Sequence, residues 1–486
     1  MFHRTNQLRS LLLAVLITFS LISCKAQMLS KAASPALPEV GIQTSYAAVV
    51  SRVMPAVVTV RSDRRVRAPQ QFPFFDDPFF RDFFGDRFRS APKDSRDMLQ
   101  RGVGSGVIVS ADGYILTNHH VIDGAEGIKV DLNDGRSFDA KVVGSDKPSD
   151  LAVLKINASN LPALPLGDSD VVKVGDVVLA VGNPLGVGQT VTMGIISAKG
   201  RQTGLSNGSF EDFLQTDAAI NRGNSGGALV NTSGELIGIN SQILSPSGGS
   251  IGLGFSIPSN MARNVMDQLT RTGRVRRGQL GIIVQKVSTD IASSLNLKEA
   301  RGVIISQVQP ASAAERAGLK QGDIITALNG VAVDTPNAFR NRIAATAPGT
   351  EVRLTILRDN REQQLSARLG EFRPEGETSN GGNGDSTGNY NTGKLGVSIE
   401  PLTPEAKSQL GLPATTQGVL VREVDPIGPA AHAGVQRGDV IEQVNQQPVR
   451  SAADVKTALE RSGDRPALLL VNRGGESVFV TVTPST

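Results

Sequence analysis

The segment Gly223-Asn-Ser-Gly-Gly227 constrains this 486-residue chain more than any other. Glycines flank its serine and let the backbone turn sharply and approach a second molecule closely. Consecutive backbone N–H groups in such a turn can form an oxyanion hole, which stabilises a developing negative charge. The meaning of the turn therefore depends on whether a base and an orienting carboxylate occur elsewhere in the chain.

Histidine is scarce, which narrows the search for a base. Of the four histidines, His3 lies in a targeting segment and His432 lies in a downstream repeat. The other two, His119 and His120, are adjacent and precede the serine. The G-x-S-x-G nucleophile elbow needs its histidine after the serine, so that interpretation of the glycine-rich turn is rejected.

The orienting acid should lie beside a buried strand, where it can hold the imidazole in one tautomer. Asp150 directly precedes the apolar run Leu151–Ile156, which is typical of a core strand. The other nearby aspartates lie in polar, turn-like stretches. The resulting order His, Asp, Ser is that of chymotrypsin.

The longer segments around these residues resemble the HtrA/Deg serine proteases. The similarity is carried by Thr117-Asn-His-His-Val-Ile122, Ser149-Asp-Leu-Ala-Val-Leu154 and Asp217-Ala-Ala-Ile-Asn-Arg-Gly-Asn-Ser-Gly-Gly-Ala-Leu229. In the T-N-x-H pattern of that family the second histidine is catalytic. The resemblance thus implies a catalytic triad of His120, Asp150 and Ser225. It also implies an oxyanion hole from the N–H groups of Gly223 and Ser225.

The resemblance further implies which residues select the substrate. The S1 pocket would be lined by Ile220, Ile243 and Leu253, which favours cleavage after small aliphatic residues. Short apolar strands separated by glycine turns fill the region from Val103 to Asn260, as in two antiparallel barrels with the site between them. We expect a mostly β chymotrypsin-like double β-barrel protease domain at 45–265.

The C-terminal half is a duplication. Ala317-Gly-Leu-Lys-Gln-Gly-Asp-Ile-Ile325 matches Ala433-Gly-Val-Gln-Arg-Gly-Asp-Val-Ile441. Both copies resemble PDZ domains, which we place at 276–370 and 394–486. A PDZ domain binds a C-terminus by strand addition and holds the carboxylate in a backbone nest. The predicted carboxylate loops contain Leu280, Gly281 and Ile282 in the first copy, and Leu395, Gly396 and Val397 in the second.

The stretch between the copies, 371–393, is rich in Gly, Asn, Ser and Thr and lacks apolar periodicity, so we interpret it as a flexible linker. Within it, Gly388-Asn-Tyr-Asn-Thr-Gly-Lys394 imitates a P-loop, but Leu395 follows where Ser or Thr should bind magnesium. We therefore predict no nucleotide site, no ATP dependence and no cofactor. No HExxH or CxxC motif indicates a metal.

The N-terminus predicts export. An apolar run, Leu11–Ile22, follows Arg4 and Arg9 and is short for a membrane span. It ends in Leu21-Ile-Ser-Cys24, which resembles a bacterial lipobox with Cys24 as the lipidated residue; cleavage after Ala26 is the alternative. We interpret 1–24 as a signal peptide and 25–44 as a tether. Cys24 is the only cysteine, so no intrachain disulfide can form.

An insertion at about 62–100 is unusual. Between Phe72 and Phe88 lie eight of the 17 phenylalanines of the chain, mixed with charges and prolines. Such aromatic density is atypical of a disordered loop. The segment is either a solvated loop with collapsed rings or an adhesive loop that docks on another subunit, as the corresponding loop does in HtrA/Deg assemblies.

Two classes of function fit these observations. The first is an ATP-independent serine endoprotease that degrades unfolded or misfolded proteins in the periplasm of a Gram-negative bacterium. The second is a binding protein, a chaperone-like scaffold with a dormant protease fold, and a blend of both is consistent with the family. The family also implies trimers and higher assemblies. A net charge of +4, without a basic run interleaved with aromatics, argues against nucleic acid as a partner.

Overall fold

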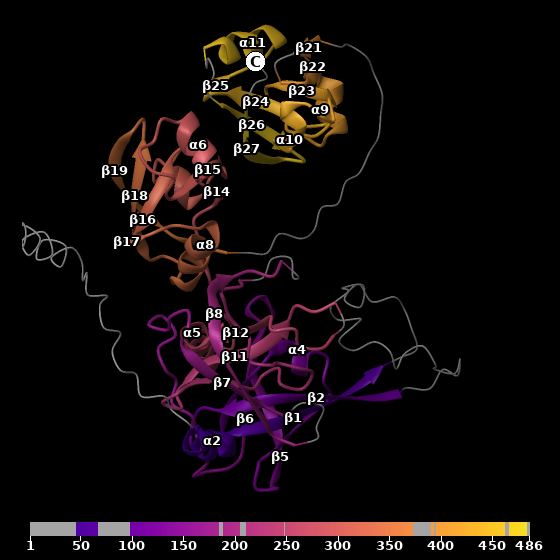
Figure 1. Ribbon diagram of the computed structural model, residues 1–486, viewed down its shortest axis with the longest axis vertical. Helices are drawn as coiled ribbons and strands as arrows, with labels where there is room; N and C mark the ends of the chain where they lie inside the picture. The colour runs from indigo at the N-terminus through magenta and orange to yellow at the C-terminus, as the bar shows by residue number, and fades with distance from the viewer. Residues whose placement is uncertain are drawn as a thin grey trace, which may run out of the picture. The chain divides into compact units, whose positions relative to one another are not determined.

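The computed structural model describes residues 45–66, 98–183, 188–204, 210–246, 248–372, 390–392, 395–461 and 466–483. Figure 1 shows their helices and strands. The predicted lipidation site Cys24, the tether and the phenylalanine-rich stretch Phe72–Phe88 lie outside the described residues. Among the described residues, no helix is both long enough and apolar enough to cross a bilayer.

A closed six-stranded barrel begins the folded chain, after the short helix α2 (Ala47–Val53) and the 3-10 turn η1 (Met54–Ala56). The strand order around the barrel is β1-β2-β3-β6-β5-β4. Its core is built by β-branched and leucine side chains, which suit a pleated surface. The strands are β1 (Val57–Val66), β2 (Met98–Ile108), β3 (Tyr114–Thr117), β4 (Gly127–Asp131), β5 (Ser137–Asp146) and β6 (Leu151–Ile156).

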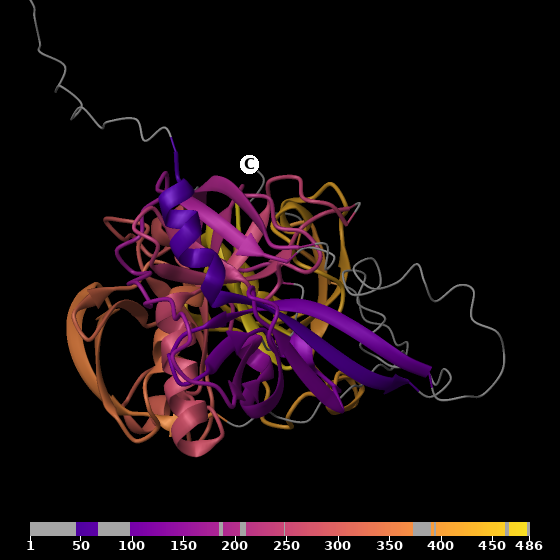
Figure 2. The same ribbon diagram turned by 90° about the horizontal axis from the view of Figure 1, so that it is seen from below.

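The insertion expected at 62–100 begins and ends inside strands. β1 and β2 stay paired as far as Val66 opposite Met98, and Figure 2 shows them projecting together from the barrel. The sequence Arg61–Arg65 is polar and contains no apolar alternation, so its pattern did not indicate a strand. The backbone ladder continues there regardless, because strand pairing uses main-chain groups that every residue except proline supplies.

A second closed barrel follows, with strand order β10-β11-β12-β9-β8-β7. Its core includes Ile196, Leu229 and Ile237, all nearly inaccessible to solvent. The strands are β7 (Val177–Gly182), β8 (Thr190–Arg201), β9 (Phe213–Thr216), β10 (Ala228–Asn231), β11 (Leu236–Ile243) and β12 (Gly254–Pro258). The helix α5 (Ser259–Thr272) closes this part of the chain and ends at Gly273, whose φ of 71° suits a left-handed cap.

The first repeat forms a sheet in the order β14-β15-β16-β18-β19, with β17 beside β16 and a separate pair β13-β20. Apolar residues including Ile305, Leu354 and Ile356 build its core. Its elements are β13 (Gly278–Gln279), β14 (Ile282–Lys286), α6 (Thr289–Ser294), β15 (Val303–Val308), α7 (Ala313–Arg316), β16 (Ile324–Leu328), β17 (Val331–Ala332), α8 (Pro336–Ala345), β18 (Glu351–Arg358), β19 (Arg361–Arg368) and β20 (Gly370–Glu371).

The second repeat follows this plan with two changes. Its sheet runs β21-β22-β23-β24-β26-β27, so an extra strand precedes the equivalent of β14. Among its described residues it also has no counterpart of the β13-β20 pair. Its elements are β21 (Tyr390–Thr392), β22 (Val397–Pro401), α9 (Pro404–Gln409), β23 (Val419–Val424), α10 (Pro429–His432), β24 (Val440–Val444), β25 (Gln447–Pro448), α11 (Ala452–Glu460), β26 (Ala467–Arg473) and β27 (Glu476–Val482).

These repeats correct the predicted linker at both ends. Residue 371 belongs to β20, and 390–392 form β21. Both strands are two or three residues long and polar, so hydrophobic periodicity cannot detect them. The predicted fold class, a mostly β chain with two barrels followed by PDZ-like domains, is confirmed.

Candidate active site

His120 is held at the start of a short helix. Strand β3 ends at Thr117, and α4 (His119–Ile122) begins after Asn118. The Asn118 side-chain amide donates to the Asp150 carbonyl oxygen (3.0 Å), and the His119 backbone N–H donates to the same oxygen (3.2 Å). The turn that carries the histidines is therefore tied directly to the segment that carries the aspartate.

Asp150 adopts a backbone conformation that few non-glycine residues take. It caps the 3-10 turn η4 (Lys147–Ser149) with a φ of 53°, in the left-handed region, and β6 begins at the next residue. Its carboxylate accepts from His120 Nδ1 (2.8 Å to Oδ2) and from the His120 backbone N–H (3.0 Å to Oδ1). The Ser241 hydroxyl donates to the same carboxylate, 2.8 Å from Oδ2.

These contacts determine the charge of the carboxyl group. Burial would raise the pKa of Asp150, but the positive charge of His120 and the hydrogen bonds from His120 and Ser241 outweigh it and lower the pKa. Asp150 is therefore ionised at neutral pH. An ionised acceptor at Nδ1 keeps a proton on that nitrogen, so Nε2 of a neutral His120 is free of a proton and basic.

Ser225 lies in a turn that only glycine permits. Gly226 has a φ of 84°, and a Cβ atom there would overlap the Ser105 carbonyl oxygen and the Thr117 side chain. Ser105, on β2 of the first barrel, donates its N–H to the Ser225 carbonyl (2.8 Å) and its hydroxyl to the Gly223 carbonyl (2.7 Å). The glycine-rich turn of the second barrel is thus fixed against the first barrel.

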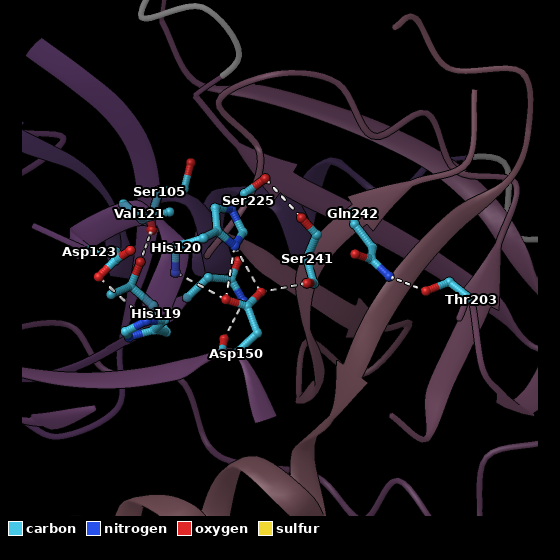
Figure 3. A network of polar contacts seen from close by, with 12 residues as sticks. Ser105, His119, His120, Val121, Asp123, Asp150, Thr203, Ser225, Ser241 and Gln242 are labelled. Atoms are coloured by element: carbon cyan, nitrogen blue, oxygen red, sulfur yellow. Dashed lines mark hydrogen bonds and ion pairs between the residues drawn. The ribbon is translucent and has the colours of Figure 1, made fainter. Parts of the chain in front are cut away.

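Ser241, on β11, links the predicted nucleophile to the predicted acid. Its carbonyl oxygen accepts from the Ser225 hydroxyl (2.9 Å), while its own hydroxyl donates to Asp150. Figure 3 shows this chain of contacts, with His120 between Ser225 and Asp150 in the view. Residues far apart in the sequence therefore meet in one polar network.

The sequence analysis did not find Ser241. A signal was present, because Asn240, Ser241 and Gln242 interrupt an apolar strand with three polar residues. Asn240 and Ser241 are buried, and a buried polar side chain requires a hydrogen-bonding partner. Ser105 was missed for a different reason: it lies in the stretch Gly102–Gly106, whose glycines do not indicate a strand.

The predicted oxyanion-hole donors are two backbone N–H groups of the glycine-rich turn. Within the described part of the chain, those of Gly223 and Ser225 donate to no acceptor, whereas the N–H of Asn224 between them donates to Asn221 (3.0 Å).

His119 does not share the contacts of His120. Its Nδ1 lies 3.3 Å from the Ser145 hydroxyl, and its Nε2 lies 3.7 Å from an Asp123 carboxylate oxygen. Burial lowers the pKa of His119, although Asp123 and Asp150 partly oppose the shift. Because its ring nitrogens face Ser145 and Asp123, His119 is a poor candidate for the base.

The three predicted S1 residues lie together beside Gly254. Ile243 is the strand partner of Gly254, and a Cβ at Gly254 would lie 3.0 Å from the end of the Ile220 side chain. Ile220 and Ile243 are buried in the core of the second barrel, and Leu253 is half-buried.

The two predicted carboxylate loops are built alike. Gly281 and Gly396 have φ values of 80° and 70°, and the preceding leucines, Leu280 and Leu395, are buried in the cores of their repeats. The Leu280 carbonyl accepts from the N–H of Ala314 (2.8 Å) and the Leu395 carbonyl accepts from that of Ala430 (3.0 Å). Ile282 and Val397 then begin β14 and β22.

Comparison with known proteins agrees with this architecture. Residues 104–239 match a trypsin-like peptidase domain, and residues 278–369 and 420–473 each match a PDZ domain. We therefore call the two repeats PDZ1 and PDZ2. The chain is a trypsin-like serine endopeptidase that carries two PDZ domains.

Several relatives cover almost the whole chain. A probable periplasmic serine protease do/HhoA-like of Haemophilus influenzae is 40% identical over 96% of this chain and 98% of its own length. The periplasmic pH-dependent serine endoprotease DegQ of Escherichia coli is 44% identical over 90% of each chain. A solved structure, the HtrA-type protease AlgWS227A with decapeptide, is 46% identical, covers 69% of this chain and 100% of its own, and has a TM-score of 0.54.

The chain therefore belongs to the HtrA/Deg family of periplasmic serine endoproteases, and the resemblance noted in the sequence is confirmed. Its compartment is the periplasm of a Gram-negative bacterium.

Proposed function

We propose that Ser225, His120 and Asp150 form the triad that hydrolyses peptide bonds through an acyl-enzyme. One observation supports this assignment above the others: the Ser241-linked network joins the hydroxyl, the carboxylate and the imidazole across two barrels. The order of these residues in the chain agrees with it.

The proton path follows from the hydrogen bonds. Asp150 accepts from Nδ1 of His120, which leaves Nε2 as the base. The Ser225 hydroxyl donates to the Ser241 carbonyl, so its hydrogen must be redirected to Nε2 of His120 before attack. As Ser225 attacks the peptide carbonyl, Nε2 of His120 takes the hydroxyl proton and then passes it to the leaving amine, which leaves an acyl-enzyme. A water molecule that His120 deprotonates then hydrolyses the acyl-enzyme, and the proton returns to Ser225.

The remaining parts of the site act on the substrate. The N–H groups of Gly223 and Ser225 receive the charge that develops on the carbonyl oxygen. Ile220, Ile243 and Leu253 form the S1 pocket and favour small aliphatic residues such as Val and Ala. No aspartate occurs among these three positions to attract a basic side chain.

The substrates are unfolded or misfolded proteins of the cell envelope, and the reaction does not use ATP. PDZ1 and PDZ2 capture substrate C-termini and regulate assembly, the chain works as a trimer that builds larger assemblies, and Cys24 anchors it to a membrane through lipid. The two PDZ domains hold clients independently of the triad, so the protein also acts as a chaperone.

Replacing Ser225 with Ala tests the chemistry. Removal of a nucleophile costs more than about 10³-fold in turnover. Cleavage of a reduced, unfolded model protein by Ser225→Ala at a rate near that of the parent would exclude this triad. The same variant should still suppress aggregation of that client; loss of suppression in a normally folded variant would exclude the chaperone role.

A further inference from the structure

The polar linker before PDZ2 contributes a strand to its sheet. β21 pairs antiparallel with β22, with Tyr390 opposite Ile399, Asn391 opposite Ser398 and Thr392 opposite Val397. Only residues 393–396 separate the two strands, and they include Leu395 and Gly396 of the predicted carboxylate loop of PDZ2. Figure 1 shows β21 beside β22 at the beginning of the domain.

In PDZ1 the residues that correspond to β21 form no strand: with Leu280 aligned to Leu395, residues 390–392 correspond to 275–277. The strand of PDZ1 before the carboxylate loop, β13, pairs with β20 through Gly278 opposite Glu371 and Gln279 opposite Gly370. Among the described residues, β14 therefore pairs on one side only, with β15, and its other edge carries no strand. The two copies thus differ at the same edge of the same sheet.

That edge is where a PDZ domain takes its ligand. A bound C-terminal peptide adds as an antiparallel strand between the first sheet strand and a helix, with its last residue at the carboxylate loop. β21 meets these criteria in PDZ2. It is antiparallel to β22, it contacts α11, and it enters with Thr392 nearest the loop.

We propose that residues Tyr390–Thr392 are an internal ligand of PDZ2, which closes its peptide site while that of PDZ1 stays open. The inference rests on the proposed capture of C-termini by PDZ domains. The two domains then bind differently. PDZ1 binds an exposed C-terminus directly, whereas PDZ2 binds one only after residues 390–392 have dissociated from β22.

The short connection makes such self-occupancy effective. A tethered segment competes at an effective concentration in the millimolar range when its linker is short and flexible. If the site is open for a fraction of the time, the apparent dissociation constant of an external peptide rises by the inverse of that fraction. Occupancy of about 90% or more would weaken external binding about tenfold or more.

The pairing itself can be trapped with cysteines. In a full-length chain carrying Cys24→Ala and Ser225→Ala, the pair Asn391→Cys and Ser398→Cys stands directly opposite in the register. This pair should form a disulfide under mild oxidation. The matched control, Asn391→Cys with Glu400→Cys, is out of register and should form it much more slowly. Equal rates for the two pairs would overturn the proposal.

A binding measurement then tests the ligand role. The probe is a fluorescein-labelled decapeptide of residues 383–392 with a free carboxylate on Thr392. Replacing 390–392 by three prolines removes every N–H that could pair with β22. The control places three prolines at 379–381. To attribute probe binding to PDZ2, Gly396→Ala is added to each chain, because a side chain at a φ of 70° strains the carboxylate loop of PDZ2. The binding that this substitution removes is binding to PDZ2.

The proline chain should bind the probe at PDZ2 at least about tenfold more tightly than the parent or the control, and the oxidised disulfide chain should not bind it there. Equal affinity of the parent and the proline chain, or no PDZ2 binding by the proline chain, would overturn the proposal. These measurements use a chain without the nucleophile. Failure of the proposed proteolysis would appear in the Ser225 experiment and leave them unaffected.

Discussion

Removing the Ser241 hydroxyl should slow catalysis without removing a triad residue. The Asp150 carboxylate accepts hydrogen bonds from three donors, which are the His120 ring, the His120 backbone N–H and the Ser241 hydroxyl. Ser241→Ala removes only the last and keeps the carbonyl that accepts from Ser225. A hydrogen bond to a charged group contributes about 1.5–3 kcal/mol, and the Asp150 side chain is 27% exposed, which favours the lower value.

A loss of about 1.5 kcal/mol in the transition state corresponds to about a tenfold lower kcat. KM should change little, because Ser241 orients Asp150 and does not contact the substrate in this assignment. Ser256→Ala is a matched control. It removes another buried hydroxyl from the same barrel, one that donates to Asn240 (2.9 Å) and has no contact with Asp150. It should reduce stability but leave kcat near that of the parent.

The pH dependence of stability tests whether the Ser241 hydroxyl acts on the ionised Asp150 carboxylate or only stabilises the fold in general. The pKa of Asp150 is lower in the folded protein than in the unfolded chain, where it is about 3.9. The ionised carboxylate therefore contributes fully to stability above the unfolded-state pKa. This contribution is lost as the pH falls through the pKa of the folded protein. Ser241→Ala raises that pKa. The stability difference between parent and variant should therefore be largest near neutral pH and shrink in acid.

Peptide turnover and urea unfolding between pH 3 and pH 7 measure both effects. A folded Ser241→Ala protein whose kcat lies within twofold of the parent would refute the reasoning that Ser241 holds Asp150 in its working orientation. A stability difference that is the same at every pH would refute the assignment of the hydrogen bond to an ionised carboxylate.

Five further changes have defined outcomes. His120→Ala should abolish turnover of a peptide substrate, and His119→Ala should be far milder; the opposite ranking would assign the base to the wrong histidine. Gly226→Ala should reduce both Tm and activity, because the added carbon overlaps a backbone carbonyl at a φ of 84°, and an unchanged melting curve would contradict this. Cys24→Ala should release the protein from membranes, whereas a parent chain that fractionates as soluble would rule out the anchor. Deleting residues 70–90 should shift assemblies toward a smaller unit in sedimentation and raise peptide turnover, since each buried phenylalanine contributes about 1.5–3 kcal/mol; no change in either would leave the insertion a simple loop.

Long or dense patterns in the sequence made the fold predictable. Apolar runs such as Leu151–Ile156 and Val177–Val181 indicated core strands, and both lie in barrels. Scarce histidine and the core strand after Asp150 limited the candidates for the triad, and the resemblance to the HtrA/Deg proteases selected His120 over His119. The strand extensions around the insertion and the short strands β20 and β21 could not be predicted, because they are held by main-chain pairing and have no side-chain periodicity.

The sequence by itself determined the class of the protein, since residue types, their order along the chain and the internal duplication depend on no coordinates. It also named the residues able to perform the chemistry. Only the tertiary structure decided how they are held: that Ser241 joins Ser225 to Asp150, that Ser105 ties the glycine turn to the other barrel, and that β21 covers the edge of β22. The physical reason is that hydrogen bonds between distant segments depend on position in space, and a lone serine or a three-residue polar strand carries no local signature of its partner.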